Sequence, residues 1–351
     1  MMERLYAVVG RIKPLHSEVM EAAAKHLDQL TKPPGSLGRL EQIAIQLAGI
    51  TGQVKPGLQH KAVVVMAGDH GVCEEGISAF PAEVTPQMVL NFLHGGAAVN
   101  VLARHAGADV VCVDVGVNAA LAHPSLVSRK VRMGTANIAR GRAMTIEEAI
   151  EAVLVGVDVA DQLCQKGVRL LAGGEMGIGN TTPSSALTVA LLGVDAERVV
   201  GRGTGIGDDQ KLHKQQVVRR AVEVNGPYEG VDPVEVLARL GGLEIAGLVG
   251  LMLGAAANRC PIVVDGFICS AAALVASRIS PESVSYMIAS HQSQEPGHRV
   301  LLEAIGLQPM LQMDMRLGEG TGAVLAFPLV EAAVKVMHEM ATFADAGVSQ
   351  G

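Results

Sequence analysis

Ala62-Val63-Val64-Val65-Met66, followed after one residue by Gly68-Asp69-His70-Gly71, is the stretch of this 351-residue chain that decides its fold class. A short β-branched run is typical of a buried strand, and the glycines and polar residues after it mark a turn at its carboxyl end. Four more such runs occur at residues 109–115, 168–172, 261–264 and 286–289, separated by longer Ala- and Leu-rich helical stretches. This alternation predicts an α/β fold with a mostly parallel sheet and helices on both of its faces.

The composition agrees with such a sheet and argues against some classes of binding partner. Hydrophobic residues make up 49% of the chain and the mean hydropathy is +0.33, which suits parallel strands covered on both faces. A net charge of −7 and only 2% aromatic residues argue against nucleic acid or an anionic membrane as a partner. The five scattered cysteines predict reduced thiols. The first residues contain no uninterrupted apolar signal core, so we expect a cytoplasmic protein.

Both ends of the chain have helical periodicity. Two sets of apolar residues each share a helical face: Val19, Ala23, Leu27 and Leu30, and then Leu40, Ile43, Leu47 and Ile50. A Pro/Gly-containing stretch at 51–57 precedes the first strand, and 329–340 is helical again. We therefore predict a small helical domain from residues 1–57 and 329–351, and a large α/β domain from 58–328. Within the large domain, Thr145 and Glu148 form a capping-box pattern before a helical run.

Polar residues gather after the predicted strands. They occupy 68–71, 116–118, 173–182, 265–267 and 290–298, and they include Asp265 and Ser290. Because ligands of open parallel sheets bind outside the carboxyl ends of the strands, these segments predict one functional rim. Asp69 and Asp265 could alternatively act only as loop caps.

Two glycine-rich loops in this region suit an anion such as phosphate. Glycine lets the backbone approach a ligand, and a following helix would point N–H groups at it. The candidate binding residues are Gly177, Ile178, Gly179, Asn180 and Thr181 in the first loop, and Gly203, Thr204 and Gly205 in the second. Neither loop matches the lysine-bearing P-loop or a dinucleotide fingerprint. The glycines could also serve only to make tight turns.

Glu319 lies between two glycines in Arg316-Leu317-Gly318-Glu319-Gly320-Thr321-Gly322. With a polar rim and anion loops nearby, a carboxylate in this setting is a candidate general base. The alternative is a solvated glutamate in a turn. The histidines show no metal-ligand spacing, so we predict no metal or cofactor and assign them hydrogen bonds that order loops.

Several long motifs, in the same order, resemble those of the nicotinate-nucleotide:dimethylbenzimidazole phosphoribosyltransferases. They lie at 32–41, 67–72, 78–85, 174–182, 203–205, 290–298 and 316–323. The resemblance implies transfer of phosphoribose from nicotinate mononucleotide to 5,6-dimethylbenzimidazole, which gives nicotinate and α-ribazole 5′-phosphate of the cobalamin lower ligand. It also implies a homodimer with a Rossmann-like large domain and a small helical domain from both chain ends.

Site roles follow from the resemblance residue by residue. It places the general base on Glu319 and supporting roles on Glu175 and Lys214. It assigns contacts with the benzimidazole to the segment 78–87, with Ser78, Phe80 and Gln87 as the candidates. Leu243, Gln292 and Gln294 depart from the usual family pattern, which leaves the identity of the acceptor base open.

The implied mechanism needs no general acid, because the departing nicotinate ring is already a pyridinium. Attack of the acceptor nitrogen from the opposite face would invert the anomeric carbon, and Glu319 would take the remaining N–H proton. Two alternatives stay open from the residues alone: a non-catalytic nucleotide-binding regulator, and a metal-dependent hydrolase that uses Asp69, His70 and His298.

Overall fold

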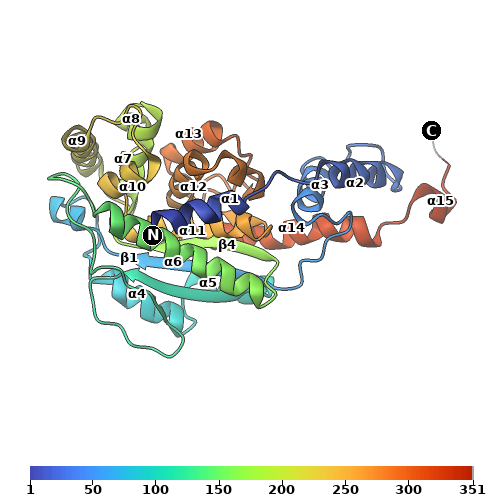
Figure 1. Ribbon diagram of the computed structural model, residues 1–351, viewed down its shortest axis with the longest axis horizontal. Helices are drawn as coiled ribbons and strands as arrows, with labels where there is room; N and C mark the ends of the chain where they lie inside the picture. Colours follow the sequence, from blue (N-terminus) through green and yellow to red (C-terminus); the bar gives the residue numbers. More distant parts are fainter. Residues whose placement is uncertain (350–351) are drawn as a thin grey trace.

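The computed structural model describes residues 1–349, and its centre is a six-stranded sheet (Figure 1). The strands are β1 (Lys61–Gly68), β2 (Asp109–Gly116), β3 (Val127–Ser128), β4 (Leu170–Met176), β5 (Ile262–Val264) and β6 (Met287–Ala289). Their order is β3-β2-β1-β4-β5-β6, and every neighbouring pair is parallel. The predicted α/β fold with a mostly parallel sheet is confirmed. Only β3 lacked a sequence signal, because two residues are too few to show a pattern.

Alternate residues of β1 explain why both faces of the sheet are covered. Ala62, Val64 and Met66 belong to one apolar cluster, whereas Val63 and Val65 belong to another. Successive strand residues point to opposite faces, so a strand that is apolar throughout needs helices on both sides. The first face is covered mainly by α6 (Ile146–Gln165), α10 (Pro233–Leu240), α11 (Leu243–Ala257) and α12 (Phe267–Ile279). The other is covered by α4 (Val84–Leu93), α5 (Ala98–Ala106) and α14 (Thr321–Glu339).

Helices α6 and α11 approach each other unusually closely. A Cβ atom on Gly250 would lie 1.7 Å from the Val153 carbonyl oxygen, and one on Gly156 would lie 1.9 Å from that of Gly247. Any side chain at these positions would therefore force the helices apart. The start of α6 carries the predicted capping box: the Thr145 hydroxyl accepts from the Glu148 N–H at 3.1 Å, and the Glu148 carboxylate accepts from the Thr145 N–H at 2.8 Å.

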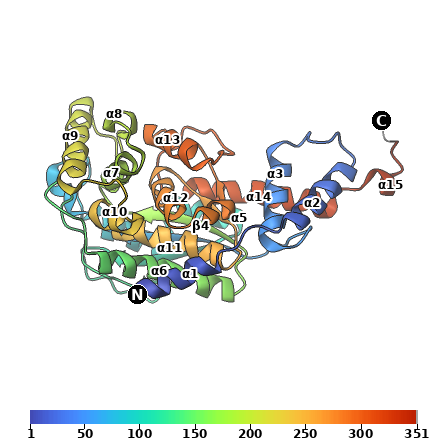
Figure 2. The same ribbon diagram turned by 45° about the horizontal axis from the view of Figure 1, so that its top comes forward.

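The remaining helices complete the layers around the sheet. They are α7 (Thr181–Leu192), α8 (Ala196–Val199), α9 (Asp208–Asn225) and α13 (Pro296–Ile305), with 3-10 helices η1 (Gly71–Glu75) and η2 (Pro281–Tyr286). The two predicted amino-terminal helices are present as α2 (Ser17–Gln29) and α3 (Arg39–Thr51). Together with the distal half of α14 and with α15 (Phe343–Ala346), they project from the sheet as a helical extension (Figures 1 and 2).

The first helix lies elsewhere. Helix α1 (Met2–Arg11) packs on α6 and α11, and Leu5, Val8 and Ile12 belong to the apolar cluster on that face of the sheet. Its periodicity showed an apolar stripe but could not show which surface the stripe covers. Helix α14 also starts at Thr321 and continues through the predicted boundary at 329. The division at 57 and 329 stays a prediction, and α1 packs on the large-domain side of it.

Helix α14 is long and apolar enough, by length and composition alone, to cross a membrane. Its side chains have another use in this structure. Ala323, Phe327 and Val330 are fully buried in the cluster that covers the second face of the sheet. The apolar character of α14 is therefore accounted for by packing inside the protein.

Candidate active site

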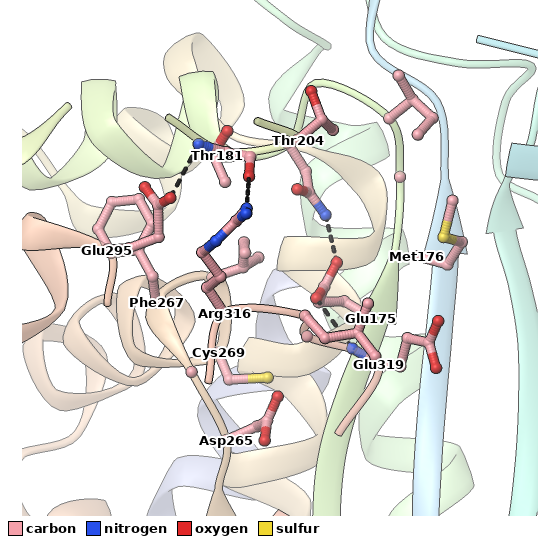
Figure 3. A pocket seen from close by; sticks show the side chains of 18 of the residues that line it. Glu175, Met176, Thr181, Thr204, Asp265, Phe267, Cys269, Glu295, Arg316 and Glu319 are labelled. Carbon is pink, nitrogen blue, oxygen red and sulfur yellow. Dashed lines mark hydrogen bonds between the residues drawn. The ribbon is translucent and has the colours of Figure 1, made fainter. Parts of the chain in front are cut away.

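The strand order places a crevice at the carboxyl ends of β1 and β4. The chain runs from β1 outward through β2 to β3, and then returns to β4 on the other side of β1. Loops that leave adjacent strands in opposite directions open a crevice, where ligands of doubly wound sheets bind. A cavity of about 420 Å³ lies there (Figure 3).

This cavity collects most of the predicted site residues. Its wall includes Phe80, Glu175, Gly177, Ile178, Gly179, Asn180, Thr181, Gly203, Thr204, Asp265 and Glu319. The Ser78 hydroxyl adjoins it through the Thr204 hydroxyl, 3.2 Å away. Gln87 is exposed on α4, where its neighbours Val84 and Met88 face the cavity instead. Ser290 is buried below the rim and donates to the Asp265 carbonyl oxygen at 3.2 Å.

The backbone at Glu319 is held in an unusual conformation. Glu319 has φ of 63° between Gly318 at 87° and Gly320 at 89°, so three successive residues are left-handed. For a residue with a Cβ this costs about 1–2 kcal/mol. Asp265, the residue after β5, stabilises this turn: its carboxylate accepts from the Gly320 N–H at 3.2 Å and the Ala323 N–H at 2.9 Å. Asp265 thus anchors both the turn and the first residues of α14.

The Glu319 side chain is buried, with the residue only 6% exposed, so the alternative of a solvated turn glutamate does not hold. Its carboxylate accepts from the Val99 N–H at 3.4 Å, in the first turn of α5. Burial raises its pKa, and the nearby Asp265 charge adds to that effect, although the Val99 N–H opposes it. A carboxylate with a raised pKa accepts a proton more readily, as a general base at neutral pH requires.

Glu175 at the end of β4 touches the same turn. Its carboxylate accepts from the Glu319 N–H at 3.4 Å and from the Asn180 side-chain amide (Figure 3). Burial, with a smaller contribution from the charges of Glu244 and Asp265, raises the pKa of Glu175 to about 8. Glu175 is therefore mostly protonated at neutral pH, when its carboxyl group can donate a hydrogen bond as well as accept one.

Lys214 and Glu295 connect the two glycine loops. The Lys214 ammonium, on α9, donates to the Thr181 hydroxyl at 2.6 Å, and burial lowers its pKa to about 8 against the opposing effect of Glu295. The Glu295 carboxylate accepts from the Gly203 N–H at 2.8 Å, and Arg316 donates to the Gly203 carbonyl at 3.2 Å (Figure 3). A carboxylate therefore already occupies one N–H group of the second predicted anion loop. The pairing joins residues 92 positions apart, so no local sequence signal could reveal it.

The histidines at the rim make hydrogen bonds to protein groups. His70 lies 2.7 Å from a Glu244 carboxylate oxygen; burial alone would lower its pKa, but Glu244 raises it. His298 lies 3.0 Å from the Ser270 hydroxyl and accepts from the Ser293 N–H, and burial lowers its pKa to about 3. Within residues 1–349, no three His, Cys, Asp or Glu side chains are arranged to hold a metal ion.

Residues 12–348 match a family model described as "Phosphoribosyltransferase". The chain belongs to this phosphoribosyltransferase family. A protein of Chloroflexus aggregans named nicotinate-nucleotide–dimethylbenzimidazole phosphoribosyltransferase is 54% identical over 350 residues, which cover 99% of each chain. A Geobacter sulfurreducens protein of the same name is 53% identical over 351 residues, or 100% of this chain and 99% of that one.

The fold is shared with these phosphoribosyltransferases as well. The crystal structure of CobT from Thermus thermophilus superposes with a TM-score of 0.92 and 52% sequence identity, and the match covers 95% of this chain and 100% of that one. The predicted family and enzyme class are therefore confirmed. Membership of an enzyme family favours a transferase over the regulator and the metal-dependent hydrolase that the sequence left open.

Proposed function

We propose that this protein transfers phosphoribose from nicotinate mononucleotide to 5,6-dimethylbenzimidazole, giving nicotinate and α-ribazole 5′-phosphate. The observation that carries the proposal is the buried Glu319 carboxylate, held by a strained turn on the wall of a cavity that is also lined by the amino terminus of α7. The names of the relatives support the two substrates. Of the departures from the family pattern, Gln292 and Gln294 lie in the loop after β6, and Leu243 is buried at the start of α11, so the test of the acceptor base below uses a panel of bases.

The cavity wall has the mixed chemistry that such substrates need. Its size, about 420 Å³, lies within the range of small-molecule sites. Apolar side chains that suit a flat aromatic base form much of it: Phe80, Val84, Met88, Met176, Ile178, Phe267 and Leu317. We assign the benzimidazole to this apolar part, with Phe80 in contact and with Ser78 and Gln87 at its margin.

We assign the donor phosphate to the first glycine loop, 177–181. Helix α7 begins at Thr181, and the first N–H groups of a helix have no partners inside it and favour an anion. The Ile178 and Asn180 N–H groups already donate to the Thr85 hydroxyl and the Gly177 carbonyl, so we assign the phosphate to those of Gly179 and Thr181. Lys214 places a positive charge behind the Thr181 hydroxyl. Because the Gly203 N–H donates to Glu295, the second loop would contribute through Thr204 and Gly205. A phosphate ion in a crystal that leaves 177–181 empty would contradict this assignment.

The reaction then needs one proton acceptor. As the ribose–nicotinate bond breaks, its electron pair neutralises the pyridinium nitrogen. A benzimidazole nitrogen forms the new bond from the opposite face, which inverts the anomeric carbon, and the N–H proton of the base passes to Glu319. Holding both substrates in one cavity makes this attack effectively intramolecular. We assign protonated Glu175 a hydrogen bond to the ribose, which the lining of the cavity by Glu175 supports.

The direct test is to mix the protein with nicotinate mononucleotide and a panel of benzimidazoles, purines and phenols, and to identify products by mass. We expect nicotinate release that depends on the acceptor and is unaffected by a chelator. Binding of nicotinate mononucleotide without acceptor-dependent release would instead support the regulator, and loss of turnover on chelation would support the hydrolase. Cytoplasmic location and a homodimer stay predictions.

Lys214 gives a pH-dependent prediction. Its pKa is about 8, so the ammonium is charged below that pH and neutral above it. If the charge holds the donor phosphate, KM for nicotinate mononucleotide rises above pH 8 in the wild type. Lys214→Met keeps the buried volume and should show a higher KM with a smaller rise across pH 7–9, because Glu175, whose pKa is also about 8, still loses the proton that it donates to the ribose. A rise as large as that of the wild type would assign the whole effect to Glu175 and contradict the role of Lys214.

A further inference from the structure

A second cavity, of about 660 Å³, lies at the opposite ends of the central strands. Its wall includes Cys164 and Arg169, which precede β4, and Arg259 and Cys260, which precede β5. Lys55, between α3 and β1, faces it from the side of the helical extension. The proposed transfer uses the carboxyl ends of the strands, so these groups are free of any role in that reaction.

The cavity is positively charged. Lys55, Arg169 and Arg259 line it, and among its lining residues, all within the described part of the chain, there is no carboxylate. The Arg259 guanidinium is held by the Ile50 carbonyl at 2.8 Å, and that of Arg169 by the Cys164 carbonyl at 3.0 Å. The two guanidinium groups are therefore fixed in place, and together with the Lys55 ammonium they attract an anionic small molecule.

Two thiols line this wall. Cys164 lies in the last turn of α6, and Cys260 directly precedes Pro261, whose carbonyl accepts from the Leu171 N–H at 3.0 Å, so both cysteines face the same cavity. Cys260 is buried and Cys164 is partly exposed. The neighbouring Cys260 thiol is the main influence on the pKa of Cys164 and lowers it; burial and Asp161 raise that pKa, and Arg169 lowers it. The Cys260 thiol donates to the Pro261 carbonyl at 3.7 Å, and its own pKa is raised by Cys164 and by burial.

The other cysteines lack these properties. Burial raises the pKa of Cys73 and of Cys112 to about 12, and that of Cys269 well above its usual value. The thiolate is the reactive form of cysteine, and a low pKa together with exposure marks a reactive thiol. Cys164 has both features, and a second thiol stands beside it.

We propose that Cys164 and Cys260 form a reversible redox pair that reacts in this cavity with an anionic low-molecular-weight disulfide. The Cys164 thiolate attacks one sulfur of the small disulfide, forming a mixed disulfide and releasing one thiolate. Cys260 then loses its proton and attacks the Cys164 sulfur, forming the protein disulfide and releasing the second thiolate. The protein is oxidised by two electrons, and the small disulfide is reduced to two thiols.

The test uses glutathione disulfide as the probe and intact-protein mass as the readout. The wild type should lose two hydrogens and regain them on reduction. Cys260→Ser should stop at a single glutathione adduct, and Cys164→Ser should acquire neither product. The control Cys112→Ser should behave like the wild type. An adduct on another cysteine, or no reaction of the wild type, would overturn the proposal. A second measurement needs no variant: the wild type is labelled with iodoacetamide and mapped by peptide mass. We expect Cys164 to be labelled before Cys112.

The charge of the cavity is tested separately with cystamine, a cationic disulfide. Lys55→Gln should slow reaction with glutathione disulfide by roughly two- to fivefold, the effect of one exposed charge, and should not slow reaction with cystamine. Lys55 has no part in the proposed transfer and does not contribute to the pKa of Cys164. Transferase turnover and the pKa of Cys164 should therefore be unchanged in Lys55→Gln. Equal slowing of both disulfides, or none, would contradict recognition of an anion.

Discussion

Glu319→Gln lowers turnover with dimethylbenzimidazole by about 10²- to 10⁴-fold, the contribution of a typical general base, while the fold and donor binding persist. The amide has nearly the shape of the carboxylate but cannot accept the proton. The side chain is buried in a turn held by Asp265, so the exchange removes charge without opening a cavity. Steady-state kinetics and calorimetric titration with nicotinate mononucleotide measure the two effects.

The matched control is Glu339→Gln, an exposed position at the far end of α14, the helix that follows the Glu319 turn; this variant should leave turnover unchanged. The pH profile supplies a second check. Because burial raises the pKa of Glu319, turnover should fall on acidification at a higher pH than an ordinary glutamate would give. In Glu319→Gln that acidic decline should vanish. Turnover of the variant close to that of the wild type would remove Glu319 from the mechanism.

Gly320→Ala is expected to reduce both stability and turnover. At φ of 89° a side chain is strained, and the new Cβ would lie 2.7 Å from a Val63 methyl group and 3.1 Å from the Gly174 Cα. Strain and overpacking together should cost about 2–4 kcal/mol of unfolding free energy. The turn would also move, and Glu319 would lose its place on the cavity wall. Denaturant unfolding and kinetics measure the two losses.

Gly306→Ala is the control that separates the effect of backbone strain from the effect of the close Cβ contacts at Gly320. Gly306 has a similar φ of 79°, but nothing lies within 4 Å of its Cβ position. This control should lose about 1–2 kcal/mol through backbone strain alone and keep full turnover. Equal turnover in the two variants would mean that the position of the Glu319 turn does not matter for the reaction.

Local pattern was sufficient for most of the fold. The β-branched runs predicted five of the six strands, and the Thr145–Glu148 pattern predicted the start of α6. These signals depend on residues a few positions apart, and short-range sterics and hydrogen bonds decide them. The packing of α1 could not be predicted in that way, because Leu5, Val8 and Ile12 define an apolar stripe but not the surface that receives it.

The site divides along the same line. The motifs around Glu175 and Glu319, and the family that they indicate, could be recognised from the sequence alone. The sequence could not predict that Glu295 accepts from the Gly203 N–H. It also could not predict that Gln87 is exposed while its neighbours Val84 and Met88 face the cavity. The Glu295 bond depends on a contact between segments that are distant in sequence, and the exposure of Gln87 depends on how α4 is rotated against its neighbours.

By itself, then, the sequence determined a parallel α/β sheet, its rim of polar loops and the identity of the candidate base, because periodicity and contiguous motifs are local properties. Only the tertiary structure decided how acidic the key groups are. Burial, together with the charges of Glu244 in α11 and of Asp265 after β5, raises the pKa of Glu175 to about 8, and burial beside Asp265 also raises that of Glu319. The tertiary structure also places Cys164 and Cys260 in the wall of the same cavity. Desolvation and long-range contact depend on the folded chain as a whole, so no stretch of sequence records them.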